Sequence, residues 1–180
     1  MSLQIALLRG VNVGGKTQVA MPALKTRLVE LGFGNPRTLL QSGNAVFESA
    51  DLAGAALEAR LEDDLERLLG RRVAVRVRSA ADWAGVVAHN PFPDEAKADP
   101  GHLLVMFLKE APSAAKVAAL QAAIPGRERL QAHGREVYIV FPDGIGRSKL
   151  TPALMEKHLG AGGTGRNWNT VMKLAAMVAA

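Results

Sequence analysis

The order of secondary-structure signals along the chain limits its fold more than any other feature of the sequence. In the first half, apolar runs of strand length alternate with stretches of helical periodicity. Leu57, Leu61 and Leu65 recur at helical spacing between charged residues, and Gly70 follows as the end of that helix. The sequence therefore predicts strands over 3–8, 37–41, 44–48 and 72–78, and helices over 21–32 and 52–69. Taken in order, these elements form a β-α-β-β-α-β unit, which is the plan of a ferredoxin-like domain.

The second half of the chain repeats this plan. A connecting helix near 80–89 and a loop rich in proline and aspartate lead to a second apolar strand. The expected elements there are strands over 103–108, 127–132 and 136–141, and helices over 113–123, from about Thr151, and over 166–178. The segment 160–165 has four glycines in six residues and is expected to be mobile.

Two segments with similar residue order indicate an internal duplication. Residues 39–47 and 129–141 both place Leu-Gln before a polar turn and then an apolar strand. We therefore expect an α+β fold with two ferredoxin-like (α/β-plait) subdomains. The first would span residues 1–98 and include the connecting helix, and the second would span residues 99–180 and include a basic C-terminal helix.

The composition is that of an ordinary globular protein, since 48% of the 180 residues are apolar and 22% are charged. The absence of cysteine excludes disulfides, thiolate metal sites and a cysteine nucleophile. The four histidines have no ligand spacing, and we expect no metal and no cofactor. No apolar run approaches the length of a membrane span, and the N-terminal apolar stretch lacks the basic start of a signal peptide. A cytoplasmic protein without a membrane partner is expected, and its oligomeric state is left open.

The net charge of +5 is concentrated at the two ends of the chain. Residues 1–37 carry five Lys or Arg against one acidic residue, residues 144–180 carry five against one, and the region between them is net acidic. Such an asymmetry indicates a local positive field suited to a phosphate, a carboxylate or a nucleic-acid backbone. The alternative is an ordinary solvated surface on a basic protein.

Residues 10–17 (GVNVGGKT) match the phosphate-loop pattern G-x-x-x-x-G-K-[ST] at every specified position. A working phosphate loop also needs a helix that begins at its Lys-Thr end, so that helical N–H groups reach the phosphate. The helical periodicity here begins only at Met21, and no Asp at the end of a separate buried strand is placed to hold Mg²⁺. We interpret the segment as an anion nest that does not hydrolyse nucleotides, the alternative being a glycine-rich turn with surface charges.

Two further loops combine glycine with polar or basic residues. Gln41-Ser42-Gly43-Asn44 joins two predicted strands and is typical of a hairpin turn. Residues 144–149 (GIGRSK) run into a predicted helix start, where backbone N–H groups bind anions.

The C-terminal segment 166–173 (RNWNTVMK) is the most distinctive stretch of the chain. On a helix it would place one polar face opposite Trp168, and that face comprises Arg166, Asn169, Thr170 and Lys173. A capped amphipathic helix packed through Trp168 is the alternative interpretation.

Four motifs, LLRGVNVGGK, LLQSGNAVF, GRSKL and RNWNTVMKL, occur in this order along the chain. In this order and spacing the chain resembles the bacterial family called domain of unknown function 1697 over essentially its whole length. The resemblance implies two ferredoxin-like subdomains and implies no particular reaction or cofactor. Relatives commonly carry Asn where this chain has Thr17, so the phosphate-loop match depends on a single residue.

The leading functional hypothesis is a binding protein for an anionic small ligand, for example one that bears phosphate, in a basic cleft between the subdomains. One alternative is a nucleic-acid-binding protein, and another is a phosphotransfer enzyme that uses residues 10–17. No catalytic residue can be assigned. The expected ligand-binding residues are Arg9, Asn12, Gly14, Gly15, Lys16, Gln41, Ser42, Asn44, Arg147, Ser148, Lys149, Arg166, Asn167, Thr170 and Lys173.

Overall fold

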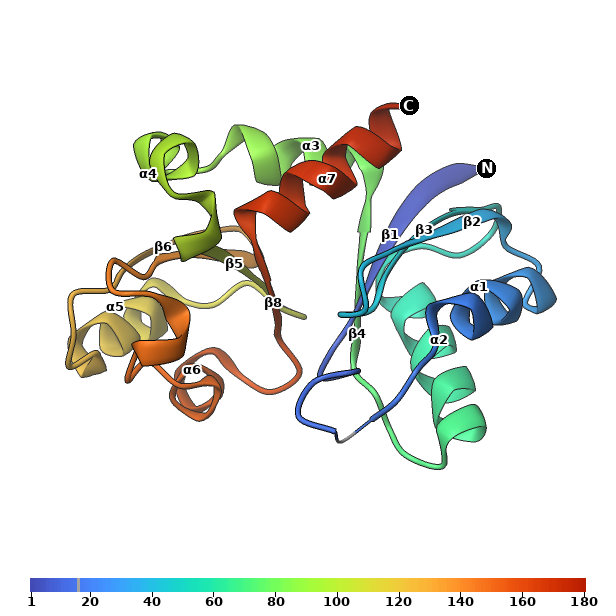
Figure 1. The fold of residues 1–180 in the computed structure, drawn as a ribbon, viewed down its shortest axis with the longest axis horizontal. Helices are drawn as coiled ribbons and strands as arrows, with labels where there is room; N and C mark the ends of the chain where they lie inside the picture. The colour runs from blue at the N-terminus through green and yellow to red at the C-terminus, as the bar shows by residue number, and fades with distance from the viewer. Residues whose placement is uncertain (16) are drawn as a thin grey trace. The chain divides into compact units, whose positions relative to one another are not determined.

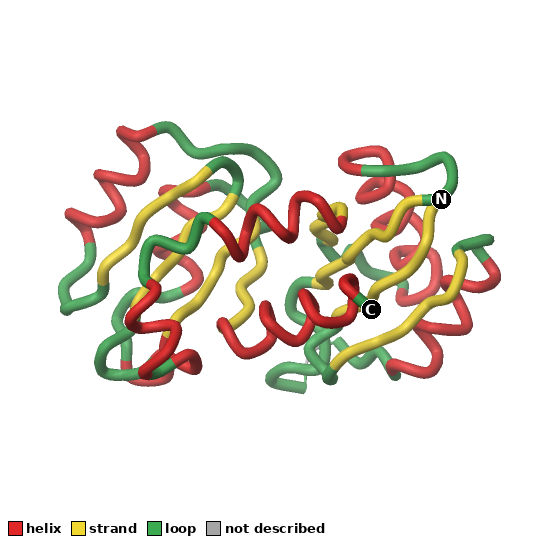
Figure 2. The backbone as a smooth tube through the Cα atoms, turned by 90° about the horizontal axis from the view of Figure 1, so that it is seen from above, coloured by secondary structure: helices red, strands yellow, loops and turns green. Residues whose placement is uncertain are grey.

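The computed structural model describes residues 1–15 and 17–180, and the chain forms two compact units. The first unit comprises residues 1–85 together with 174–180, and the second comprises residues 86–173. Each unit contains one four-stranded antiparallel sheet with helices packed on it (Figure 1). Figure 2, coloured by secondary structure, shows the strands of each sheet beside one another.

The first unit has the predicted β-α-β-β-α-β order. Its elements are β1 (Ser2–Leu8), α1 (Met21–Glu30), β2 (Gly34–Leu39), β3 (Asn44–Ser49), α2 (Gly54–Leu69) and β4 (Val75–Ser79). The strands are arranged as β2-β3-β1-β4, and every neighbouring pair is antiparallel. Both helices lie on the same side of this sheet (Figure 1).

The second unit repeats the order and the arrangement. Its elements are β5 (Leu103–Phe107), α5 (Ala114–Ala123), β6 (Arg129–His133), β7 (Glu136–Val140), α6 (Pro152–Leu159) and β8 (Thr164–Asn167). The strands are arranged as β6-β7-β5-β8, which is the order of the first sheet. The prediction of two ferredoxin-like subdomains is therefore confirmed.

Five shorter or connecting elements complete the chain. They are α3 (Ala80–Ala88), α4 (Pro93–Ala98), η1 (Pro100–His102), η2 (Ile145–Arg147) and α7 (Trp168–Ala179). The loop rich in proline and aspartate that was expected after the connecting helix, residues 90–101, contains α4 and most of η1. Pro93 at the start of α4, followed by two acidic residues in its first turn, explains this short helix, because both features favour a helix N-terminus.

The strand register also repeats between the two units. In the first sheet Ile5 lies opposite Val46 on one side and Arg78 on the other. In the second sheet Val105 lies opposite Tyr138 and Arg166 in the same way. This equivalence, which reaches to individual residues, supports the internal duplication proposed from the sequence.

The segment 160–178 departs from the prediction. Residues Thr164–Asn167 form β8, which pairs with β5, and the last helix begins at Trp168 rather than at 166. A Cβ atom on Gly165 would lie 2.9 Å from Met106 Sδ, and one on Gly163 would lie 2.9 Å from Leu108 Cδ2. These glycines therefore lie close to the ends of the Met106 and Leu108 side chains in a strand and the residue before it, whereas they were expected to indicate mobility.

The core of the first unit lies between its sheet and its two helices. Leu24 and Leu28 of α1 and Leu61 of α2 are buried there against the sheet. Ala6 and Ala45 lie opposite each other in the register of β1 and β3, and a cavity of about 10 Å³ remains beside these two small side chains.

An ion pair joins the two helices beside that cavity. Arg27 Nε of α1 donates a 2.7 Å hydrogen bond to Asp64 Oδ2 of α2, and a second guanidinium nitrogen bonds the other carboxylate oxygen. This bidentate contact holds the pKa of the buried Asp64 carboxyl below its usual value, because the hydrogen bonds favour the charged form.

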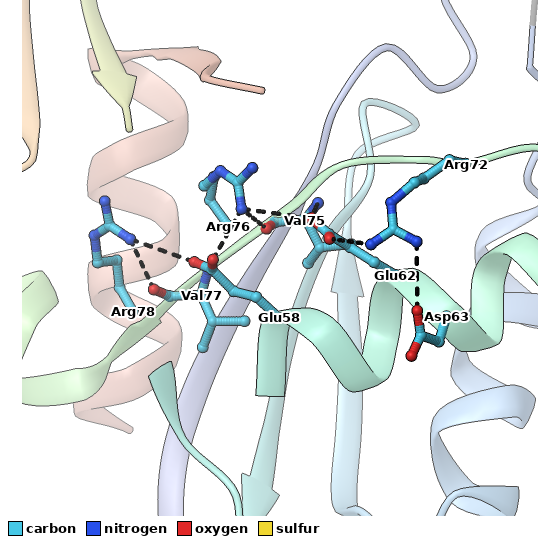
Figure 3. A network of polar contacts seen from close by, with 8 residues as sticks. All are labelled: Glu58, Glu62, Asp63, Arg72, Val75, Arg76, Val77 and Arg78. Carbon is cyan, nitrogen blue, oxygen red and sulfur yellow. Dashed lines mark hydrogen bonds and ion pairs between the residues drawn. The ribbon is translucent and has the colours of Figure 1, made fainter. Parts of the chain in front are cut away.

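Strand β4 lies at an edge of its sheet, and carboxylates from α2 satisfy its outward backbone N–H groups (Figure 3). Glu58 Oε1 accepts from Val77 N–H at 2.8 Å, and Glu62 Oε1 accepts from Val75 N–H at 2.9 Å. Arg76 Nη1 in turn donates to Glu58 Oε2 at 2.8 Å. Because an open strand edge is a template for pairing with other chains, these buried carboxylates close the edge.

Residues 86–98 lie in the second unit, although the sequence analysis grouped them with the first half. Tyr138 Oη donates a 2.7 Å hydrogen bond to the carbonyl of Val86, and the His89 ring stacks on His133 with centroids 3.9 Å apart. The boundary expected at residue 98 stays a prediction.

Candidate anion-binding site

The segment after β1, residues 9–15 and 17–20, is called the glycine loop below. It contacts residues 40–43, the turn between β2 and β3. Leu8 N–H donates a 2.8 Å hydrogen bond to the carbonyl of Gly43. Asn12 Nδ2 donates to the carbonyls of Gln41 and Val19, both at 2.7 Å, and Asn12 Oδ1 accepts from Val19 N–H at 2.9 Å. The Asn12 amide thus closes the glycine loop and ties it to the turn, bringing two of the sequence motifs together.

Gly43 is the point of closest approach between the turn and the glycine loop. Its φ is +83°, and a Cβ atom there would lie 2.6 Å from Val11 Cγ2 and 2.8 Å from Leu8 Cβ. No other residue type meets both conditions without strain, since only glycine lacks the Cβ. The turn is therefore a packing surface for the glycine loop as well as a hairpin connection.

The tip of the glycine loop is exposed backbone. Gly14 and Gly15 have φ of +60° and +69° and are exposed, and apart from the adjoining residues no heavy atom of the described chain lies within 4 Å of either Cβ position. Left-handed backbone within a turn directs successive N–H groups toward one side, as in anion-binding nests. Lys16, predicted to contribute a charge here, lies outside the described residues.

One arginine begins the glycine loop, and a second arginine contacts it from another segment. Arg9 N–H donates a 2.9 Å hydrogen bond to the carbonyl of Ala74, which places the start of the loop beside the segment that leads into β4. Arg71, from the same segment, donates from Nη1 to Thr17 Oγ1 at 3.1 Å, and its side chain is exposed. The sequence analysis missed Arg71, because only the pairing of β1 with β4 brings it next to residues more than 50 positions away. Two consecutive arginines at 71 and 72, close to the start of a strand, were the sequence signal that could have indicated this contribution to the site.

The turn contributes polar groups of two kinds. The Asn44 side chain is buried and donates to the carbonyl of Leu39 at 2.7 Å and to Ser42 Oγ at 3.0 Å, so it supports the turn from inside. Gln41 is exposed, and Ser42 is half-buried. Of the predicted residues in this turn, Gln41 is therefore the most accessible to a ligand.

The second glycine-rich loop, residues 142–149, is arranged differently. The Ser148 hydroxyl donates to the Glu128 carboxylate and accepts from Leu150 N–H at 3.0 Å. Thr151 Oγ1 accepts from Leu154 N–H at 3.2 Å and so caps α6. Arg147 and Lys149, the two basic residues of this loop, are exposed. A carboxylate at the loop and a filled helix cap make this a weaker anion site than the glycine loop.

The C-terminal motif lies on a helix as expected from Trp168 onward, but its first two residues belong to a strand. Arg166 and Asn167 lie on β8, so they do not share a helical face with Thr170 and Lys173. Asn167 Oδ1 instead accepts from Thr170 N–H at 3.0 Å, a contact at the start of α7. The exposed Lys173 lies on α7. Asn167 thus lies just before α7, whereas Asn169 lies in its first turn.

Arg166 is only 7% exposed, and its guanidinium is engaged within the protein. Its Nη1 donates to Thr164 Oγ1 at 2.7 Å and to the carbonyl of Gly165 at 2.8 Å. Burial lowers the pKa of Arg166 to about 10, because the charged form loses hydration.

The predicted site residues thus form two sets. Those of the first unit that the structure describes are Arg9, Asn12, Gly14, Gly15, Gln41, Ser42 and Asn44, and the glycine loop and turn bring them together. Those of the second unit are Arg147, Ser148, Lys149, Arg166, Asn167, Thr170 and Lys173. Their role in ligand binding remains a prediction for both sets.

Two kinds of feature are absent from the described residues. They contain no cluster of three or more His, Asp or Glu that could hold a metal ion. Within the same residues, no helix has both the length and the apolar character needed to cross a membrane.

The two sheets, with their shared strand order, define the chain as an α+β protein with two ferredoxin-like units. The chain belongs to the family described as Protein of unknown function (DUF1697), whose model matches residues 1–138. Its fold is similar to that of the conserved bacterial protein SP0830 from Streptococcus pneumoniae, with a TM-score of 0.78 and 23% identity over 100% of this chain and 99% of the other. A comparison with curated proteins gave no match.

Proposed function

We propose that the chain binds an anionic small molecule, such as one bearing a phosphate group, at the glycine loop of the first unit. The observation that carries this proposal is that Arg71 Nη1 contacts Thr17 in the same loop that exposes the left-handed glycines at 14 and 15 and begins at Arg9. Backbone N–H groups supply directed hydrogen bonds to an oxyanion, and arginine supplies bidentate charge-assisted bonds. The exposed Gln41 amide is a further donor at the same site.

Nucleotide hydrolysis at the same loop is less well supported. In a phosphate-loop enzyme the strand before the loop feeds a helix that starts at the Lys-Thr end. Here β1 has antiparallel neighbours on both sides, and α1 begins at Met21, four residues after Thr17. These features favour reversible anion binding over phosphotransfer.

Nucleic-acid binding through a sheet is also less well supported. A plait sheet that binds RNA stacks bases on exposed aromatic side chains. Phe47 is the aromatic residue of strands β1–β4, and it is fully buried in the core. Phe107 and Tyr138 of the second sheet are also buried. The Phe and Tyr side chains of the described strands therefore offer no exposed surface for base stacking.

Calorimetric titration with inorganic phosphate at low ionic strength tests the proposal. We expect Arg71→Gln and Arg9→Gln each to weaken phosphate binding about tenfold, which corresponds to about 1.4 kcal/mol. The matched control is Lys25→Gln, which removes one exposed positive charge from α1 of the same unit and should leave the affinity within about twofold. Unchanged affinity in Arg71→Gln, or an equal loss in the control, would contradict a site at the glycine loop.

A further inference from the structure

Leu40, in the turn that supports the glycine loop, has an unusual backbone conformation. Its φ is +58°, in the left-handed region that favours glycine and asparagine, and its side chain is 48% exposed. A leucine in this position contributes little to the core and strains the backbone. Folding alone therefore gives no reason for an apolar side chain here, where glycine would be more stable.

A second exposed apolar side chain lies on the adjoining segment. Val13 is 55% exposed, and it follows Asn12, whose Nδ2 bonds the carbonyl of Gln41 at 2.7 Å. Gln41 directly follows Leu40. This hydrogen bond therefore puts Val13 and Leu40 on two segments that touch, next to the exposed glycines of the loop.

We propose that Leu40 and Val13 form an apolar wall of the anion site, so that its ligand is an organic anion with an apolar group beside the charge. This inference rests on the proposed function, because it adds a ligand class to the same site. An inorganic anion would contact only the arginines and the backbone N–H groups. A ligand with an aromatic or aliphatic group next to its phosphate or carboxylate would also remove the two apolar side chains from water.

The test compares phenyl phosphate with inorganic phosphate by calorimetry. Wild type is expected to bind phenyl phosphate about tenfold more tightly than inorganic phosphate, because the phenyl ring and part of one apolar side chain are removed from water. Leu40→Gly and Leu40→Asn should abolish this preference while leaving the affinity for inorganic phosphate within about twofold. Both replacements suit a left-handed φ, so thermal melting should show that the variants are folded and at least as stable as wild type.

Leu68→Asn is the matched control, since Leu68 is an exposed leucine on α2. It should keep the preference for phenyl phosphate. Equal affinity of wild type for the two probes would overturn this inference and leave the proposed function standing. Failure of both probes to bind in an Arg71-dependent way would overturn the inference together with the proposed function.

Discussion

At the scale of single residues, glycines of this chain have different structural roles that the sequence does not distinguish. Gly43 combines a positive φ with contacts too close for any Cβ, whereas Gly14 has a similar φ and open space around it. The first is needed for packing, and the second leaves the backbone accessible. A substitution at each position therefore separates the steric contribution from the conformational one.

Gly43→Ala is expected to lower the free energy of unfolding by about 2 to 4 kcal/mol, because left-handed strain adds to overlap with Leu8 and Val11. Gly14→Ala should lower it by only about 1 kcal/mol, since strain acts there alone. Urea denaturation of the two variants measures both values. Equal losses would show that the turn does not pack against the glycine loop as described.

At the scale of elements, the edge of β4 depends on buried carboxylates of α2. Glu58 is buried and accepts hydrogen bonds from a backbone N–H and from Arg76, whereas Glu66, on the same helix, is exposed and bonds Arg72. A buried charge with fixed partners is costly to alter, while an exposed ion pair contributes little. The two glutamates should therefore respond very differently to the same replacement.

Glu58→Gln is expected to destabilise the protein by about 3 kcal/mol, because the amide places a donor against Val77 N–H or the Arg76 guanidinium. Glu66→Gln should change the stability by less than about 1 kcal/mol. The measurement is the urea midpoint at constant slope, with light scattering to detect association through the opened edge. Matching midpoints for the two variants would mean that Glu58 does not secure β4.

At the scale of the whole molecule, local patterns in the sequence predicted most of the fold. The leucine spacing of α2 and the repeated strand order gave the two ferredoxin-like units, because these signals depend on neighbours in sequence. Strand β8 was missed because its pairing with β5 joins residues that are distant in sequence. Arg71 was missed for the same reason, since its place beside Thr17 follows from the pairing of distant strands.

The candidate site also has features that the sequence predicts and features that only the structure shows. The glycine loop and the turn stood out in the sequence, but only the structure shows that Asn12 joins them and that Arg166 is a buried strand residue. The residue types in the sequence indicated anion binding. The hydrogen-bond partners and the burial of each side chain in the structure then show which groups are accessible to a ligand.

The central claim is that the glycine loop binds an anion. Its most direct test is a titration of the isotopically labelled protein with inorganic phosphate, in which the amide chemical shifts are measured by NMR. If the glycine loop is the anion site, the amide signals of Gly14 and Gly15 shift saturably, and the Arg71→Gln variant weakens that response. Saturable shifts confined to residues outside the glycine loop and its neighbours 40–43 and 71–74, or no saturable shift at all, would contradict the account.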